Sequence, residues 1–86
     1  MTIDAQKGGR AVVALDGAFD CAAADRLHET LVELGPVPVT VDFRQVRMID
    51  DSAVGRLARE TAGGQHLALV GLSVHHHRLL RYLGSN

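Results

Sequence analysis

The spacing of apolar residues changes abruptly in the middle of this chain, and that change constrains the fold more than any other feature. Within Val37–Asp42 every second residue is a valine, and a period of two predicts a β-strand. From Val54 onward the apolar residues follow a helical spacing. Asp50, Asp51 and Ser52 are therefore expected where a strand gives way to a helix. In α/β proteins ligands and partners bind at such corners, and a helix start favours negative charge.

The remaining segments continue this alternation of strand and helix. Asp20 can cap the first helix, Gly35 followed by Pro36 ends it, and Ser73 can cap the last one. The order of strand, strand, helix, strand, helix, strand, helix predicts one α/β domain over residues 1–86, with a four-stranded, mostly parallel sheet. The expected strands are Thr2–Gln6, Ala11–Leu15, Val37–Asp42 and His66–Val70, and the expected helices are Ala22–Leu34, Ser52–Ala62 (closed by Gly63-Gly64) and a segment that follows Ser73 and runs to Leu83.

The two faces of the expected sheet differ in character. A sheet covered by helices on both faces is strongly apolar on both, and this one is not. We therefore expect the helices mainly on one face, with the other face thinly covered and suited at most to weak self-association. The apolar face comprises Val13, Leu15, Val37, Val39, Val41, Leu67 and Leu69, and the lighter face comprises Val12, Ala14, Pro38, Thr40, His66, Ala68 and Val70.

Composition excludes several classes of function. A net charge of -1 and an aromatic content of 3% argue against electrostatic binding to nucleic acid and against base stacking. The single cysteine, Cys21, excludes an intramolecular disulfide and a cysteine-based zinc cluster. Every apolar run is far shorter than the roughly 18 residues of a spanning helix, and the first residues lack the apolar core of a secretory signal. We expect a cytoplasmic module without membrane insertion.

Four short segments carry a specific pattern, in a fixed order along the chain. They are Leu15–Asp20, Val41–Phe43, Ile49–Leu57 and Leu69–Ser73. Together they resemble the STAS domain, the fold of anti-sigma factor antagonists, over a length that runs from about Ala11 to Gly84. The resemblance implies a small β/α superhelix, in agreement with the one-sided sheet.

The central motif of that family usually reads Asp-Ser-Ser-Gly, and the resemblance implies a switch at its first serine. An anti-sigma kinase phosphorylates this serine, and the unphosphorylated protein captures the kinase and frees the sigma factor. Asp50 matches the aspartate of the motif, Ser52 matches the second serine, and Ala53 replaces the glycine. Asp51 occupies the place of the phosphorylated serine, and Asp20 matches a family aspartate near that site.

The aspartate at position 51 changes what the motif can do. Phosphoserine carries about −1.5 to −2 charge and three acceptor oxygens, whereas aspartate carries one negative charge and two oxygens. Asp51 is therefore a permanent and imperfect imitation of the phosphorylated state. We hypothesise that position 51 does not switch, and that Ser52 is the hydroxyl left as a substitute acceptor. The alternative is that Asp51 or Ser52 simply caps the helix.

An acidic pocket competes with this interpretation. Asp20, Asp42, Asp50 and Asp51 all lie at or near expected strand ends, where they could hold Mg²⁺ as in phospho-receiver domains. Such a site also needs a cation after a late strand, and the only lysine of the chain, Lys7, lies near its beginning. The receiver-like acceptor is therefore the second alternative.

The histidine triplet and the cysteine carry weaker signals. Consecutive helical residues point about 100° apart, so His75, His76 and His77 cannot all face one metal ion. His76 precedes Leu80 by one turn and is expected to lean inward. Cys21 has no neighbour in the sequence that completes a nucleophilic pair.

These observations predict a regulatory protein-binding module, without catalysis, cofactor or metal. The expected partner is an anti-sigma factor or serine-kinase-like protein, and the oligomeric state is a monomer or weak dimer. The alternative partner is the ATPase of an ABC-type lipid transport system, since some STAS proteins are small cytoplasmic subunits of such systems and need no serine phosphorylation. The expected docking surface is the loop Arg47–Ser52 with the exposed face of the next helix, and it comprises Asp20, Asp50, Asp51, Ser52, Ala53, Val54, Arg56 and Arg59.

Overall fold

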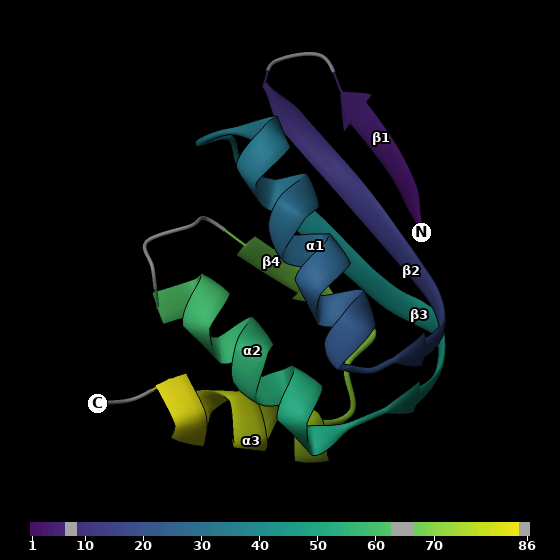
Figure 1. Ribbon diagram of the computed structural model, residues 1–86, viewed down its shortest axis with the longest axis vertical. Helices are drawn as coiled ribbons and strands as arrows, with labels where there is room; N and C mark the ends of the chain where they lie inside the picture. The colour runs from purple at the N-terminus through teal and green to yellow at the C-terminus, as the bar shows by residue number, and fades with distance from the viewer. Residues whose placement is uncertain (7–8, 63–66, 85–86) are drawn as a thin grey trace.

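A computed structural model of the chain describes residues 1–6, 9–62 and 67–84, and it confirms the predicted order of elements (Figure 1). The sheet order is β1-β2-β3-β4, with β1 antiparallel to β2 and the other neighbours parallel. The predicted α/β class and mostly parallel sheet are therefore correct. The elements are β1 (Thr2–Gln6), β2 (Arg10–Phe19), α1 (Cys21–Leu34), β3 (Val39–Ile49), α2 (Asp51–Ala62), β4 (Leu67–Val70) and α3 (Val74–Gly84).

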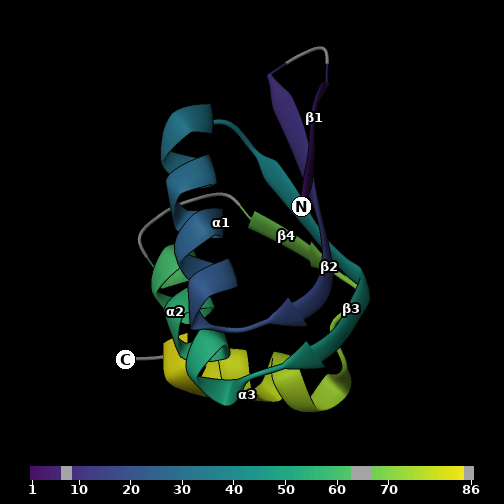
Figure 2. The same ribbon diagram turned by 45° about the vertical axis from the view of Figure 1, so that its right-hand side comes forward.

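The helices lie to one side of the sheet, as the two unequal faces predicted. Helices α1 and α2 cover one face, and α3 lies across one end of the molecule against α2 (Figures 1 and 2). Val13 and Val41 on the covered face are fully buried, whereas Ala68 and Val70 on the opposite face are exposed. Within the described residues, no helix covers that second face. His66, Lys7, Gly63 and Gly64 lie outside the described residues.

The covered face, the helices and the ends of the strands share one apolar core. Its largest fully buried side chains include Phe19 at the end of β2 and Phe43 within β3. The two rings meet edge to face, with centroids 5.2 Å apart and an interplanar angle of 90°. Leu27 of α1 and Leu57 of α2 pack into the same cluster. This core fixes both helices against the strands whose ends carry the candidate site.

Strands β2 and β3 run further than the sequence predicted. We expected them to end at Leu15 and Asp42, where the apolar alternation stops, but they continue to Phe19 and Ile49. Backbone pairing persists through this polar stretch, with register shifts between Ala14 and Asp16 and again beyond Gly17. Such irregularities bend a ladder without ending it. As a result, both strands end level with each other, at the pair formed by Phe19 and Ile49.

The predicted helix ends are largely correct. The Asp20 carboxylate accepts a hydrogen bond from the Ala23 N–H at 2.9 Å, and Gly35 ends α1 with a φ of 79°. The Val37 N–H donates to the Gly35 carbonyl oxygen at 2.9 Å. Val37 therefore belongs to the turn after α1, and β3 begins at Val39 instead.

Candidate functional site

Strands β2 and β3 end opposite each other, and the strand-to-helix corners that follow them lie side by side. Asp20 joins β2 to α1, and Asp50 joins β3 to α2. The Asp50 N–H donates to the Phe19 carbonyl oxygen at 3.0 Å, which ties the two corners together. The Asp50 carbonyl oxygen accepts from the N–H groups of Ala53 and Val54, at 3.0 and 3.2 Å, and so begins α2. The backbone thus fixes where the acidic residues lie.

Asp50, Asp51 and Ser52, which we call the acidic turn, are all exposed. Within the described part of the chain, neither carboxylate takes part in a hydrogen bond or an ion pair. The alternative in which the side chain of Asp51 or Ser52 caps α2 is therefore not what the structure shows. Asp51 still lies in the first helical turn, where the helix dipole favours negative charge. Two carboxylates at one helix start thus face solvent with their hydrogen-bonding capacity unused by the fold.

Two residues of the expected docking surface are not exposed. The exposed fractions of Ala53 and Val54 are 0% and 1%, so the prediction that they lie on the outer face of α2 is wrong. The physical reason is the apolar stripe of the helix, because Ala53, Val54, Leu57 and Ala58 all face the core. Ala53 and Val54 therefore belong to the core that holds α2 in place.

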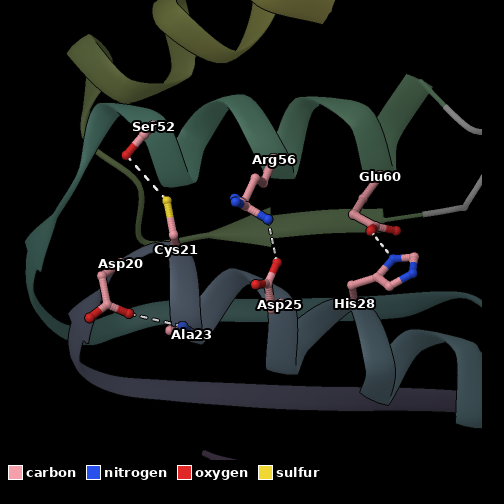
Figure 3. Close-up of polar contacts among 8 residues, drawn as sticks. All are labelled: Asp20, Cys21, Ala23, Asp25, His28, Ser52, Arg56 and Glu60. Carbon is pink, nitrogen blue, oxygen red and sulfur yellow. Dashed lines mark hydrogen bonds and ion pairs between the residues drawn. The ribbon is translucent and has the colours of Figure 1, made fainter.

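A row of polar contacts joins α1 to α2, and we call it the α1–α2 ladder (Figure 3). The Cys21 thiol donates to the Ser52 hydroxyl, with 3.4 Å between sulfur and oxygen. One helical turn further along, the Arg56 guanidinium pairs with the Asp25 carboxylate at 2.5 Å. The third contact joins the His28 imidazole to the Glu60 carboxylate. Ser52, Arg56 and Glu60 recur every four residues, so they lie along one face of α2.

Arg56 is therefore already engaged within the fold, although it is exposed. Hydrogen bonding to the Cys21 thiol, followed by the charge of Asp25, raises the pKa of Arg56 above its ordinary value. Arg59 is also exposed, but it has no hydrogen bond or ion pair with another described residue. Of the two predicted arginines, Arg59 is thus the one whose guanidinium is available to a partner.

A groove of about 510 Å³ adjoins the acidic turn. Ser52, Arg56 and Arg59, three of the residues predicted for docking, lie on its wall. Asp20 caps α1 at the neighbouring corner and is exposed. The groove is lined by Cys21, Ser52, Gly55, Arg56, Ala58, Arg59, Ala62 and Leu83.

The four-carboxylate pocket of the receiver-like alternative is not formed. Asp42 pairs with Ala14 and Val70 within the sheet, and its carboxylate binds the Arg44 guanidinium at 2.8 Å. Since β3 continues to Ile49, the acidic turn starts eight positions further along the chain, beyond the end of that strand. The prediction that Asp42 lies at a strand end was wrong for this reason.

The fold instead brings Asp51 to the histidine triplet. Ligand atoms of Asp51, His75 and His76 all lie within 4.8 Å of one another, and His77 is not part of this group. His76 is partly buried, as predicted from its position one turn before Leu80. The sequence could not reveal this cluster, because α3 follows α2 through β4 and nothing local shows that their first turns meet.

A one-sided mixed sheet with an exposed acidic corner defines a small α/β domain whose site lies on its surface. A protein-family model described as "Mlab, STAS domain" matches residues 3–86. The chain therefore belongs to the STAS family, whose domains are generally non-catalytic modules that bind protein partners. A comparison with curated proteins finds no significant match. None of the described helices combines the length and the apolar character needed to cross a membrane.

Proposed function

We propose that this protein is a regulatory docking module of the anti-sigma-antagonist type, which binds its partner at the acidic turn. The observation that carries the proposal is the state of the Asp50 and Asp51 side chains: both are exposed at a helix start, and neither carboxylate forms a hydrogen bond or ion pair with another described residue. Four other charged or titratable side chains between α1 and α2 pair with one another in the ladder, Asp25 with Arg56 and His28 with Glu60. The two carboxylates of the acidic turn are thus left for a partner, together with the Arg59 guanidinium beside them.

The charges indicate what the partner must offer. Arginine and lysine side chains form strong, charge-assisted hydrogen bonds with exposed carboxylates. The adjoining groove adds the Arg59 guanidinium, which suits a carboxylate of the partner. A partner surface with basic groups opposite the turn and an acidic group opposite Arg59 fits this site.

Asp51 favours a second candidate, the ATPase of an ABC-type transport system. In an antagonist that switches, the unphosphorylated form captures the kinase. A permanent negative charge at position 51 imitates the other form, so it opposes that capture. A STAS subunit that docks without serine phosphorylation has no such conflict. Ser52 remains exposed and could restore a switch if a kinase acts on it.

Replacement of Asp51 tests whether the turn is the docking site. We expect Asp51→Ser to change the affinity for the purified partner several-fold, and to alter the free energy of unfolding by less than about 2 kcal/mol. Glu33→Ser is the matched control, since Glu33 is exposed on α1 and lies outside the ladder and the groove. Calorimetric titration gives the affinity. Equal affinities for the wild type and Asp51→Ser would remove the turn from the interface.

Affinity capture followed by mass spectrometry separates the two partner classes. Recovery of an anti-sigma kinase supports the antagonist role, and recovery of an ABC ATPase supports the transport role. The same spectra report on Ser52 after incubation with the captured kinase. A phosphate on Ser52 establishes a switch at that residue, whereas an unmodified chain supports fixed affinity.

A further inference from the structure

The cluster of Asp51, His75 and His76 combines side chains that are far apart in the sequence. Asp51 begins α2, and the two histidines lie in the first turn of α3. One carboxylate and two imidazoles are a donor set typical of zinc and similar divalent ions, whereas magnesium and calcium prefer oxygen alone. The composition of the cluster therefore indicates a particular class of ligand.

The spacing of the cluster is close to what such an ion needs. The three ligand atoms lie within 4.8 Å of one another. Bond lengths of 2.0–2.2 Å in a tetrahedral zinc site separate neighbouring ligand atoms by about 3.3 Å. Asp51 and His75 are exposed, so rotation of their side chains can close the difference. The two imidazole centroids are already 5.1 Å apart, and two imidazoles on one tetrahedral ion lie about 5 Å apart.

Ser73 lies within hydrogen-bonding distance of one of the two imidazoles, that of His76. The Ser73 hydroxyl oxygen lies 2.7 Å from His76 Nδ1 and accepts the backbone N–H of His76 at 3.2 Å. When Nδ1 donates its hydrogen to this oxygen, Nε2 carries the free lone pair. A metal-binding histidine is usually held in this way, with its second ring nitrogen bonded to a neighbouring acceptor. In the tautomer that donates from Nδ1 to Ser73, His76 is held by this bond and its Nε2 is the atom that can coordinate a metal.

We propose that Asp51, His75 and His76 form a binding site for one zinc-like divalent ion, with water in the remaining position. The first turns of α2 and α3 both present positive dipole ends here, which opposes a cation, and the Asp51 carboxylate offsets that effect. An ion at this site links α2 to α3 and neutralises the charge of the acidic turn. The proposal is independent of the docking partner, because the isolated chain suffices to test it.

Calorimetric titration of tag-free protein with zinc chloride tests the site. We expect one ion per chain and a rise in Tm relative to protein in a chelator. Asp51→Asn and His75→Ala each weaken binding by more than about tenfold. His77→Ala is the matched control, since His77 is a neighbouring exposed histidine outside the cluster, and its affinity stays within about twofold. Circular dichroism shows that each variant is folded.

Three outcomes would overturn the proposal. The first is an equal loss of affinity in His77→Ala and His75→Ala, which would mean that zinc binds the triplet without a defined site. The second is a stoichiometry of one ion per two chains with a doubled mass in sedimentation, which would mean that the ion bridges molecules. Asp51→Asn with wild-type affinity would likewise remove the carboxylate from the site.

Discussion

At the scale of single residues, the corner between β4 and α3 depends on a glycine. Gly71 has a φ of 86°, a conformation that residues with a Cβ rarely adopt. A Cβ at this position would lie 2.8 Å from the backbone nitrogen of Arg44 and 3.1 Å from its Cα. The chain therefore passes so close to β3 that only glycine fits. This contact holds the chain against β3 two residues before Ser73, whose hydroxyl caps α3.

Substitution of Gly71 should destabilise the protein more than substitution of Gly17. Both residues have positive φ, which costs roughly 1–2 kcal/mol for alanine, but a Cβ on Gly17 has no neighbour within 4 Å. Gly71→Ala adds the overlap with Arg44, for a total of about 2–5 kcal/mol. Urea denaturation of both variants measures the difference. Equal losses of stability in the two variants would show that β3 shifts enough to accommodate the added Cβ.

At the scale of elements, α1 and α2 are held together by the core and by the α1–α2 ladder. The ladder depends on matched spacing, since Cys21, Asp25 and His28 on α1 lie opposite residues that recur every four positions on α2. Each contact is exposed to solvent, so each is worth little by itself. The core sets the orientation of the two helices, and three residues of the ladder, Cys21, Ser52 and Arg56, line the groove beside it.

The pair of Asp25 and Arg56 should show a small but real coupling. A double-mutant cycle of Asp25→Ala and Arg56→Ala should give about 0.2–1 kcal/mol of interaction energy, and less in high salt. Arg59 has no described partner, so the control cycle of Asp25→Ala with Arg59→Ala should give nearly zero. The free energies of unfolding come from urea titration. Equal coupling in the two cycles would mean that Arg56 does not depend on Asp25.

The sequence predicted these elements unevenly, and the physical reasons differ. Helix ends are set by local chemistry, so Asp20, Gly35 and Ser73 located them within a residue or two. The ends of β2 and β3 depend on backbone pairing between distant segments, which continues after the apolar alternation stops. The ladder depends on which helices become neighbours, and no local pattern contains that information.

At the scale of the whole molecule, the sheet is covered on one face and open on the other. The open face carries a charged pair, in which Asp42 accepts three side-chain hydrogen bonds from Arg44, at 2.8 to 3.1 Å, and one from its backbone N–H at 2.9 Å. These bonds lower the pKa of Asp42 below its ordinary value of 3.8, and the side-chain hydrogen bonding from Arg44 contributes most, followed by the bond from its backbone N–H. A shallow hollow of about 340 Å³ lies elsewhere on the sheet, beside Val12 and Thr40.

The response to acid should reveal the contribution of Asp42. Because its pKa is lowered in the folded state, its stabilising effect is present above the unfolded pKa of 3.8 and is lost as the pH falls through the folded pKa. The difference in free energy of unfolding between the wild type and Asp42→Asn should therefore be largest near neutral pH and should shrink below pH 3.8. In an Arg44→Gln background, the difference in free energy of unfolding that Asp42→Asn causes should likewise be smaller. A difference that does not change with pH would mean that the pair adds nothing.

The candidate site was predictable only in part at this scale. The acidic turn follows from a change of period in the sequence, and its exposure agrees with that expectation. The burial of Val54 also follows from the helical stripe, although we placed this residue on the outer face. The meeting of Asp51 with His75 and His76 depends on the path of α3 beside α2, which only the folded chain specifies.

The hydrogen bond from Asp50 N–H to the Phe19 carbonyl gives the two corners a mechanical consequence. A loop held only at its ends absorbs a push by bending. Here the start of α2 is bonded to β2, the strand that leads into α1, and the Asp20 carboxylate caps the first turn of α1. A displacement at the start of α2 therefore also strains the bond to the end of β2, one residue before the cap of α1.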